Sequence, residues 1–280
     1  MNWIPEDREF WITKGQKIAR KNLWISIPAL FLALAVWMVW SAVVTNLPKI
    51  GFNFTTDQLF WLVSISGLSG ATLRIFYSFM IPIFGGRYWT AISTASLLIP
   101  TIGIGMLVQN PDSTYHQFLM LSILCGLGGA NFASSMTNIA YFYPKKEKGH
   151  ALALNAGLGN LGVSAVQFFV PLVITVGIFG GTGQIIGGKE IWLQNAGYIW
   201  VPFIALSAIA AWLFMDDVSV KSSLSDQIVI FKRKHNWIMC LLYGGTFGSF
   251  IGFSAGFPLL ANLQFPDVNS LQLAFIGPLV

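Results

Sequence analysis

The sequence predicts an all-α integral membrane protein, and three observations support this class. Its 280 residues are 55% hydrophobic and only 10% charged, whereas soluble domains carry about a quarter charged residues. The apolar residues gather in runs as long as a bilayer-crossing helix, which needs roughly 20 residues. The basic residues fall in alternate connections between these runs, as they do in the cytoplasmic loops of multi-pass proteins.

Seven apolar runs are expected to be spans, and an eighth is incomplete. The seven are Leu23–Leu47, Leu59–Phe84, Trp89–Val108, Phe118–Phe142, Ala151–Phe179, Tyr198–Met215 and Trp237–Leu260. The eighth begins near Leu271 and stops at Val280, about half-way through a membrane. We therefore expect the sequence to be truncated at its C-terminal end.

The hydrophilic segments divide the chain into four parts. We expect a cytoplasmic N-terminal segment over residues 1–22, a six-helix transmembrane bundle over 23–215, and a cytoplasmic linker over 216–236. A second, truncated set of helices is expected over 237–280. Six helices, a linker and a second set are the plan of transporters that consist of two halves around a site at mid-membrane.

The distribution of charge predicts the orientation in the membrane. Thirteen Lys and Arg residues lie on the side of the N-terminus, and only Lys49 and Lys189 lie on the other side. Cytoplasmic loops carry the excess of basic residues, so the N-terminus is expected to be cytoplasmic. This asymmetry accounts for the net charge of +5 and gives no support to a nucleic-acid partner.

Arg74 is the most informative single residue. It is the only charged residue between Asp57 and Arg87, and it lies midway along the second run. A guanidinium at that depth costs several kcal/mol unless its charge is answered, and arginine does not lose its proton to escape this cost. Two partners are open, an anionic ligand or a structural contact with a carboxylate or carbonyls. The absence of Asp and Glu from the interior of the runs favours the ligand.

Three runs carry polar or aromatic residues at helical spacing, so that each set shares one face. The sets are Asn131, Ser134, Ser135 and Asn138; Gly157, Asn160, Ser164 and Gln167; and Tyr243, Phe247, Phe250 and Ser254. Each face alone is explained by hydrogen bonds between helices. Together with the buried arginine they predict a polar cavity inside the bundle.

The remaining titratable residues bear on coupling and on the ligand. The carboxylates, like His116, His150 and His235, are confined to loops and run ends, which favours exchange or uniport over proton symport. One guanidinium, Asn amides and a Tyr hydroxyl beside Phe rings suit a small planar oxyanion. A phosphate would need more positive charge.

Several other patterns have structural explanations. Gly157–Gly162 matches GxGxxG and Gly183–Lys189 nearly matches a phosphate-binding loop, but neither lies in the strand–helix context that nucleotide sites need. Four glycines in the seventh run repeat every four residues and predict close contact with another helix. They are Gly244, Gly248, Gly252 and Gly256. A surface on which helices slide during transport is compatible with this contact. Cys125 and Cys240 lie in runs and are expected to be buried.

Four segments resemble one known family. They are GFNFTTDQLFWL (51–62), RIFYSFMIPIFGGR (74–87), residues 125–164 and TFGSFIGFSAGFPLL (246–260). The chain resembles the nitrate/nitrite porter family of the major facilitator superfamily, and in particular its bacterial NarK-type exchangers. AGLGNLG (156–162) is similar to the nitrate signature of that family, and FGGRYW (84–89) to a reduced form of the general facilitator loop motif.

The resemblance implies a role for individual residues. Arg74 would be the substrate-binding arginine, Asn160 the signature asparagine that hydrogen-bonds the anion, and Tyr243 the tyrosine at the site. Phe132 and Phe247 would stack on the anion. Gly157, with Gly159 and Gly162, would let the fifth helix pack and shift. The second binding arginine and second signature of the family would lie beyond Val280, so we expect half a site and no transport by the 280-residue product alone.

The expected fold is that of the major facilitator superfamily, as the N-terminal six-helix half plus the first one to two helices of the second half. The expected function is nitrate uptake in exchange for nitrite by alternating access, in a bacterial inner membrane, by a protein that is monomeric at full length. A nitrate/proton symporter and a non-transporting anion-binding membrane sensor are the alternatives. No nucleophile–base pair or metal-ligand group appears at recognisable spacing, so neither an enzyme nor a cofactor is expected.

Overall fold

The computed structural model describes residues 3–186, 188–218, 228–265 and 274–279. The predicted start of the eighth run at Leu271, and residues 219–227 of the predicted linker with Lys221, lie outside the described residues. Within the described part of the chain, seven helices are long and apolar enough to cross a membrane. The predicted all-α membrane class is therefore confirmed.

Several of these spans are built from consecutive pieces. The helical elements are α1 (Arg8–Phe10), the π-helical turn η1 (Trp11–Gly15), α2 (Gln16–Met38), α3 (Trp40–Val43), the 3-10 turn η2 (Pro48–Ile50), α4 (Thr56–Phe84), α5 (Gly86–Ala95), α6 (Leu98–Leu107), α7 (Tyr115–Phe142), α8 (Lys145–Val173), α9 (Asn195–Tyr198), α10 (Val201–Phe214), the 3-10 turn η3 (Val229–Lys232), α12 (Lys234–Gln264) and α14 (Ile276–Leu279). A short antiparallel hairpin joins β1 (Gln184–Ile186) to β2 (Lys189–Ile191).

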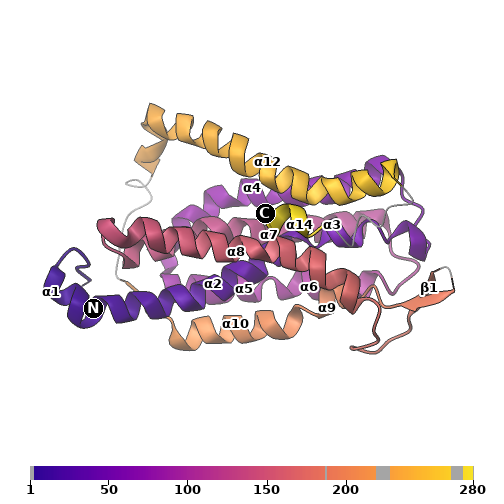
Figure 1. Cartoon of the computed structure of the whole chain (residues 1–280), viewed down its shortest axis with the longest axis horizontal. Helices are drawn as coiled ribbons and strands as arrows, with labels where there is room; N and C mark the ends of the chain where they lie inside the picture. The colour runs from indigo at the N-terminus through magenta and orange to yellow at the C-terminus, as the bar shows by residue number, and fades with distance from the viewer. Residues whose placement is uncertain (1–2, 187, 219–227, 266–273, 280) are drawn as a thin grey trace.

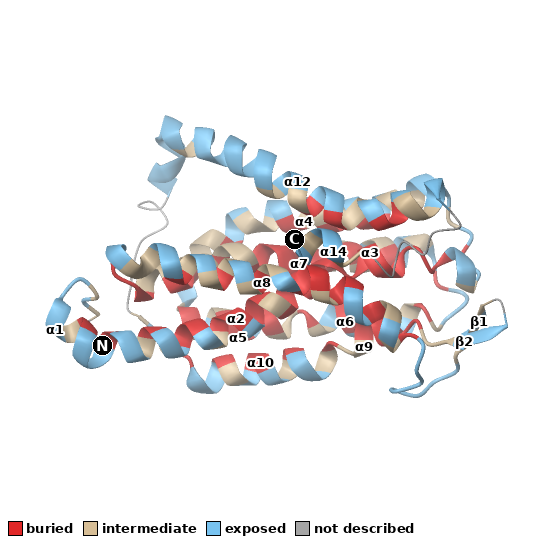
Figure 2. Cartoon of the chain, viewed as in Figure 1, coloured by how far each residue is buried: buried red, intermediate tan, exposed pale blue. Residues whose placement is uncertain are grey.

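The long helices run side by side along the longest axis of the molecule (Figure 1). Helix α2 packs against α7 and α8, α4 packs against α7, and α10 lies along α5 and α2. Figure 2 shows that the buried residues concentrate where these helices meet, whereas α12 is mostly exposed along its length. The core thus belongs to the first six spans, and α12 leans on it through α4 and α3.

Helices α4 and α7 begin earlier than the apolar runs because polar residues cap them. Thr55 and Gln58 form a reciprocal capping box at the start of α4, and Thr114 with Gln117 does the same for α7. The first helix begins at Arg8, so most of residues 1–22 continue into the first span. The division of the chain into four parts stays a prediction.

Helix α8 ends at Val173, six residues before the predicted end of its run at Phe179. The Asn195 side chain explains this end, because its Nδ2 donates to the carbonyl oxygens of Val173, at 2.9 Å, and Val176, at 2.6 Å. These bonds take up carbonyls that a continuing helix would need. Hydrophobicity extends past this point, and the helix does not.

The expected packing role of GxGxxG is confirmed for two of its glycines. At Gly162 a Cβ would overlap the carbonyl oxygen of Phe31 in α2, and at Gly159 it would lie 2.7 Å from the Leu30 side chain. A Cβ on Gly157 would meet nothing within 4 Å. The near phosphate-binding loop forms part of the β1–β2 hairpin, which is not the strand–loop–helix that such loops require.

Charged side chains gather at the end of the bundle that carries the N-terminus. Lys21 Nζ lies 2.6 Å from Asp216 Oδ2, and the backbone N–H of Arg87 donates to Asp217 Oδ1 at 2.8 Å. These residues come from three segments that the charge pattern predicts on one side of the membrane. Their meeting agrees with seven alternating spans, while the side itself stays a prediction.

Candidate anion site

Arg74 lies near the middle of α4, and its side chain bonds to one backbone carbonyl. Its Nε donates to the carbonyl oxygen of Gly129 in α7 at 2.9 Å. Its Nη2 is buried and has no partner among the described residues. The one ion pair between described residues is Lys21–Asp216, so no described carboxylate answers the charge of Arg74. The structural contact that the sequence left open is thus present at Nε. Nη2 remains free to bind an anionic ligand.

Three aromatic rings surround the guanidinium. The Arg74 Cζ atom lies 5.1 Å from the ring centroids of Trp37 and Phe132 and 4.8 Å from that of Phe247. Ring faces attract a cation, most strongly where water is scarce. The rings thus offset part of the charge without using the in-plane N–H groups that an oxyanion would bind.

A cavity of about 620 Å³ adjoins these residues between α4 and α12. The Tyr243 hydroxyl interacts with the guanidinium, and its ring stacks on Phe247 at a centroid distance of 5.1 Å and an interplanar angle of 12°. Arg74, Tyr243, Phe247 and Trp37 all line the cavity. Among the described residues that line the cavity, Arg74 is the only cation, so the site favours negative charge.

Four of the six residues that the sequence places at a binding site come together here. They are Arg74 from α4, Phe132 from α7, and Tyr243 with Phe247 from α12. Phe247 contacts each of the other three, and Arg74 also contacts Phe132 and Tyr243. Asn160 and Gly157, on α8, do not line this cavity and have no described contact with Arg74. The Asn160 Oδ1 atom is buried without a partner among the described residues. The roles of all six stay predictions.

The polar face of α7 holds helices together, so its predicted place on an anion cavity is wrong. Ser135 Oγ bonds to Ser26 Oγ in α2 and accepts from Asn155 Nδ2 in α8, both at 2.9 Å. Asn131 Nδ2 donates to the Ser93 carbonyl oxygen in α5 at 3.3 Å. The space beside this face is only about 10 Å³. Helix-to-helix hydrogen bonding, the simpler explanation for such faces, holds here.

The polar end of the α8 face also joins helices. Gln167 Nε2 donates to Ser41 Oγ at 3.1 Å and to the Ser254 carbonyl oxygen of α12 at 2.6 Å. Ser164 Oγ donates to the Phe275 carbonyl oxygen at 2.8 Å. These bonds tie the helix after the linker to the first six spans.

Two expectations for α12 are wrong within the described part of the chain. The four glycines of its stripe line the cavity, and a Cβ on any of them would meet nothing within 4 Å. Among the described residues they therefore widen the space beside α4 and contact no other helix closely. Cys240 is exposed and lines the same cavity, whereas Cys125 is buried as expected.

Sequence reasoning missed Trp37 and Ser66. The Trp37 Nε1 donates to the Ser66 carbonyl oxygen at 2.8 Å, and Ser66 Oγ donates to the Trp37 carbonyl oxygen at 3.0 Å. Trp37 lies in an apolar run where nothing distinguishes it from other buried aromatic residues. The spacing of Ser66, Gly70 and Arg74 at i, i+4 and i+8 was the available signal for a shared helix face.

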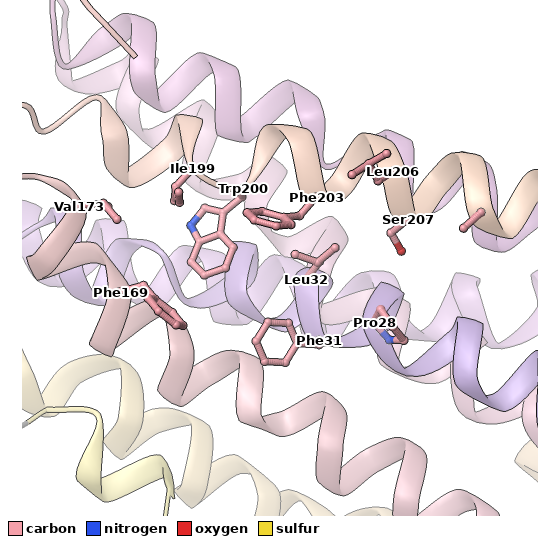
Figure 3. Close-up of a pocket in the computed structure, with 11 residues that line it drawn as sticks. Pro28, Phe31, Leu32, Phe169, Val173, Ile199, Trp200, Phe203, Leu206 and Ser207 are labelled. Carbon is pink, nitrogen blue, oxygen red and sulfur yellow. The ribbon is translucent and has the colours of Figure 1, made fainter. Parts of the chain in front are cut away.

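A second cavity, of about 570 Å³, lies between α2, α8 and α10 (Figure 3). Its lining is apolar and includes Phe31, Phe169 and Phe203, and no charged side chain takes part. Nothing there offsets the loss of water around a bound anion. The Arg74 cavity is therefore the better candidate site.

Comparison with known proteins bears on the family. The family model of the Major Facilitator Superfamily matches residues 16–280. The chain is 55% identical to the nitrate/nitrite transporter NarU of Escherichia coli (strain K12) over 284 aligned positions, which cover 100% of this chain and 62% of that protein. The NarU of Salmonella typhimurium gives the same identity and coverage.

A more distant relative agrees. The probable nitrate/nitrite antiporter NarK2 of Thermus thermophilus is 44% identical over 100% of this chain and 65% of its own length. The chain thus spans less than two thirds of the length of these curated relatives. Their names confirm the resemblance to nitrate/nitrite porters that the motifs indicated. With the seven apolar helices and the match of the family model, they show that the chain belongs to the major facilitator superfamily.

Proposed function

We propose that the complete protein containing this chain moves nitrate into a bacterial cell in exchange for nitrite, by alternating access across the inner membrane. The observation that carries the proposal is Arg74, a half-buried arginine whose Nη2 atom is buried without a partner among the described residues, and which has no described carboxylate partner. The printed names of the relatives supply the two candidate anions.

The geometry around Arg74 suits a small planar oxyanion. A guanidinium presents its N–H groups in one plane and matches flat oxyanions in that plane. Phe132 and Phe247 border the same charge with their rings, and the Tyr243 hydroxyl supplies a further polar group. Asn160, by resemblance, would add an amide donor as the two halves close around the anion.

The same charge supports exchange as the mode of coupling. With no anion bound, the guanidinium lacks a negative partner among the described residues. Moving an uncompensated charge through the closed, dry intermediate is costly, so the empty protein crosses slowly. A protein that must carry one anion in each direction therefore exchanges nitrate for nitrite.

Counterflow in liposomes tests the proposal. The complete protein is reconstituted, and uptake of labelled nitrate is measured with nitrite or with buffer inside, with and without a pH gradient. We expect uptake that depends on internal nitrite, ignores the pH gradient and is lost in Arg74→Lys, because an ammonium cannot present two donors in one plane. Uptake that follows the proton gradient without nitrite would instead establish symport. Nitrate binding without flux would establish a sensor.

A further inference from the structure

We propose that Trp37 is a positioning residue that holds the Arg74 guanidinium in the orientation in which it receives the anion. The identity of the anion rests on the function proposed above, whereas the arrangement of the two side chains rests on contacts within the chain. Trp37 is 4% exposed, and its ring centroid lies 5.1 Å from the Arg74 Cζ atom.

Trp37 is fixed on the same face of α4 that carries the arginine. Ser66, Gly70 and Arg74 are spaced i, i+4 and i+8, so they form one stripe along that helix. The indole Nε1 donates to the Ser66 carbonyl oxygen at 2.8 Å, and Ser66 Oγ returns a bond to the Trp37 backbone at 3.0 Å. One end of the stripe thus anchors the indole, and the other end carries the cation.

Glycines on two helices clear the space for this ring. A Cβ on Gly70 would lie 2.7 Å from the indole Nε1, and a Cβ on Gly129 would overlap the ring. Gly129 is also the residue whose carbonyl accepts from Arg74 Nε, at 2.9 Å. The same backbone position therefore locates both the indole and the guanidinium.

The other two rings lack such an anchor. Phe132 and Phe247 contact each other at a centroid distance of 5.3 Å and carry no polar atom to bond with the backbone. Phe247 also lies on α12, after the linker. Trp37 is therefore the ring whose place is set by the helix of Arg74 itself.

Trp40 is a matched control in the same span. It is 1% exposed and packs against Phe118 at a centroid distance of 6.1 Å. It has no described contact with Arg74. Replacing either tryptophan by leucine removes a similar volume from the core, so the two variants separate loss of packing from loss of the cation contact.

The first test observes the arginine without any anion. The complete protein, labelled with ¹⁵N-arginine, is placed in nanodiscs, and the Nε–H signal of Arg74 is assigned from its loss in Arg74→Lys. We expect Trp37→Leu to shift this signal and to speed its exchange with water, and Trp40→Leu to leave it in place. An unchanged Arg74 signal in Trp37→Leu would overturn the inference.

The second test measures nitrate affinity by titration calorimetry in the same preparations. We expect Trp37→Leu to weaken binding about 5- to 30-fold, which is the range of a desolvated cation–ring contact. Trp37→Phe keeps a ring face but loses the indole N–H that bonds to Ser66, so it should recover only part of the affinity. Trp40→Leu should bind as the native protein does. Equal losses in the two leucine variants would contradict a positioning role.

The two tests keep the two proposals apart. Absence of nitrate binding by the native protein would overturn the proposed function, and the arginine signal would still decide the place of Trp37. Where Trp37→Leu does not fold, Ser66→Ala serves instead, since it removes one anchor bond and leaves the indole in the core. Ser66→Ala should then speed exchange at Arg74 Nε–H, and an unaltered exchange rate would count against the inference.

Discussion

At the scale of single residues, the chain keeps a charge in its interior at a cost to its own stability. Arg74 gives one nitrogen to a carbonyl, lies among three rings and leaves Nη2 without a partner among the described residues. Buried ionic groups are often replaced by apolar side chains without loss of stability. Retention of this group therefore points to function.

Replacing Arg74 by methionine should separate stability from binding. We expect Arg74→Met to raise the free energy of unfolding by about 1 kcal/mol, because the half-buried charge no longer has to be desolvated. Nitrate should raise the melting temperature of the native protein and not that of the variant. Thermal unfolding with and without nitrate measures both effects. An equal nitrate-induced shift in the variant would remove Arg74 from the site.

At the scale of elements, close packing of α8 on α2 depends on particular glycines. A Cβ on Gly162 overlaps the backbone of α2, whereas Gly157, on the same helix, faces open space within the described part of the chain. Both glycines belong to the same GxGxxG motif, and the sequence alone does not distinguish them. The structure therefore divides it into a packing part and a part that is free for another role.

Two alanine variants test this division. Gly162→Ala should lower the free energy of unfolding by about 1–3 kcal/mol, because the two helices must move apart. Gly157→Ala should leave stability unchanged or slightly higher, since alanine favours the helix. Chemical or thermal unfolding of both variants in the same detergent decides. A loss of nitrate affinity in the stable Gly157→Ala variant would agree with its implied site role.

The sequence was a good guide to spans and a poor guide to contacts. Apolar runs predicted the seven helices because bilayer thickness fixes their length. They missed starts set by polar caps, as at Thr55, and the end of α8, which Asn195 determines from a distant segment. Arg74 could be singled out because a lone charge in an apolar run is conspicuous. Trp37 could not, since its role is set by tertiary contacts with α4 and α7.

At the scale of the whole molecule, the alternation of spans fixes which loops share a side. The contact of Lys21 with Asp216 and that of Arg87 with Asp217 gather three segments at one end of the bundle. Lys49 lies in the connection after the first span, and Lys146 lies in the first turn of α8, directly after the fourth span. The charge pattern assigns the Lys146 end to the cytoplasm.

Cysteine labelling of whole cells tests this orientation. In a background with Cys125→Ser and Cys240→Ser, Lys49→Cys should react with a membrane-impermeant maleimide in intact cells. Lys146→Cys should react only after the membrane is permeabilised. Both side chains are exposed, so access is limited by the membrane alone. The reverse pattern would place the N-terminus outside the cell.

The contact between α4 and α12 links the hydration of Arg74 to the relative movement of these two helices. Arg74 belongs to the first six spans, and Phe247 belongs to the helix after the linker, yet the ring lies 4.8 Å from the arginine Cζ atom. Any movement that separates these two helices also moves the Phe247 ring away from the Arg74 guanidinium and lets water reach it. Hydration of the Arg74 guanidinium and separation of α4 from α12 therefore occur together. A measurement of either one reports the other.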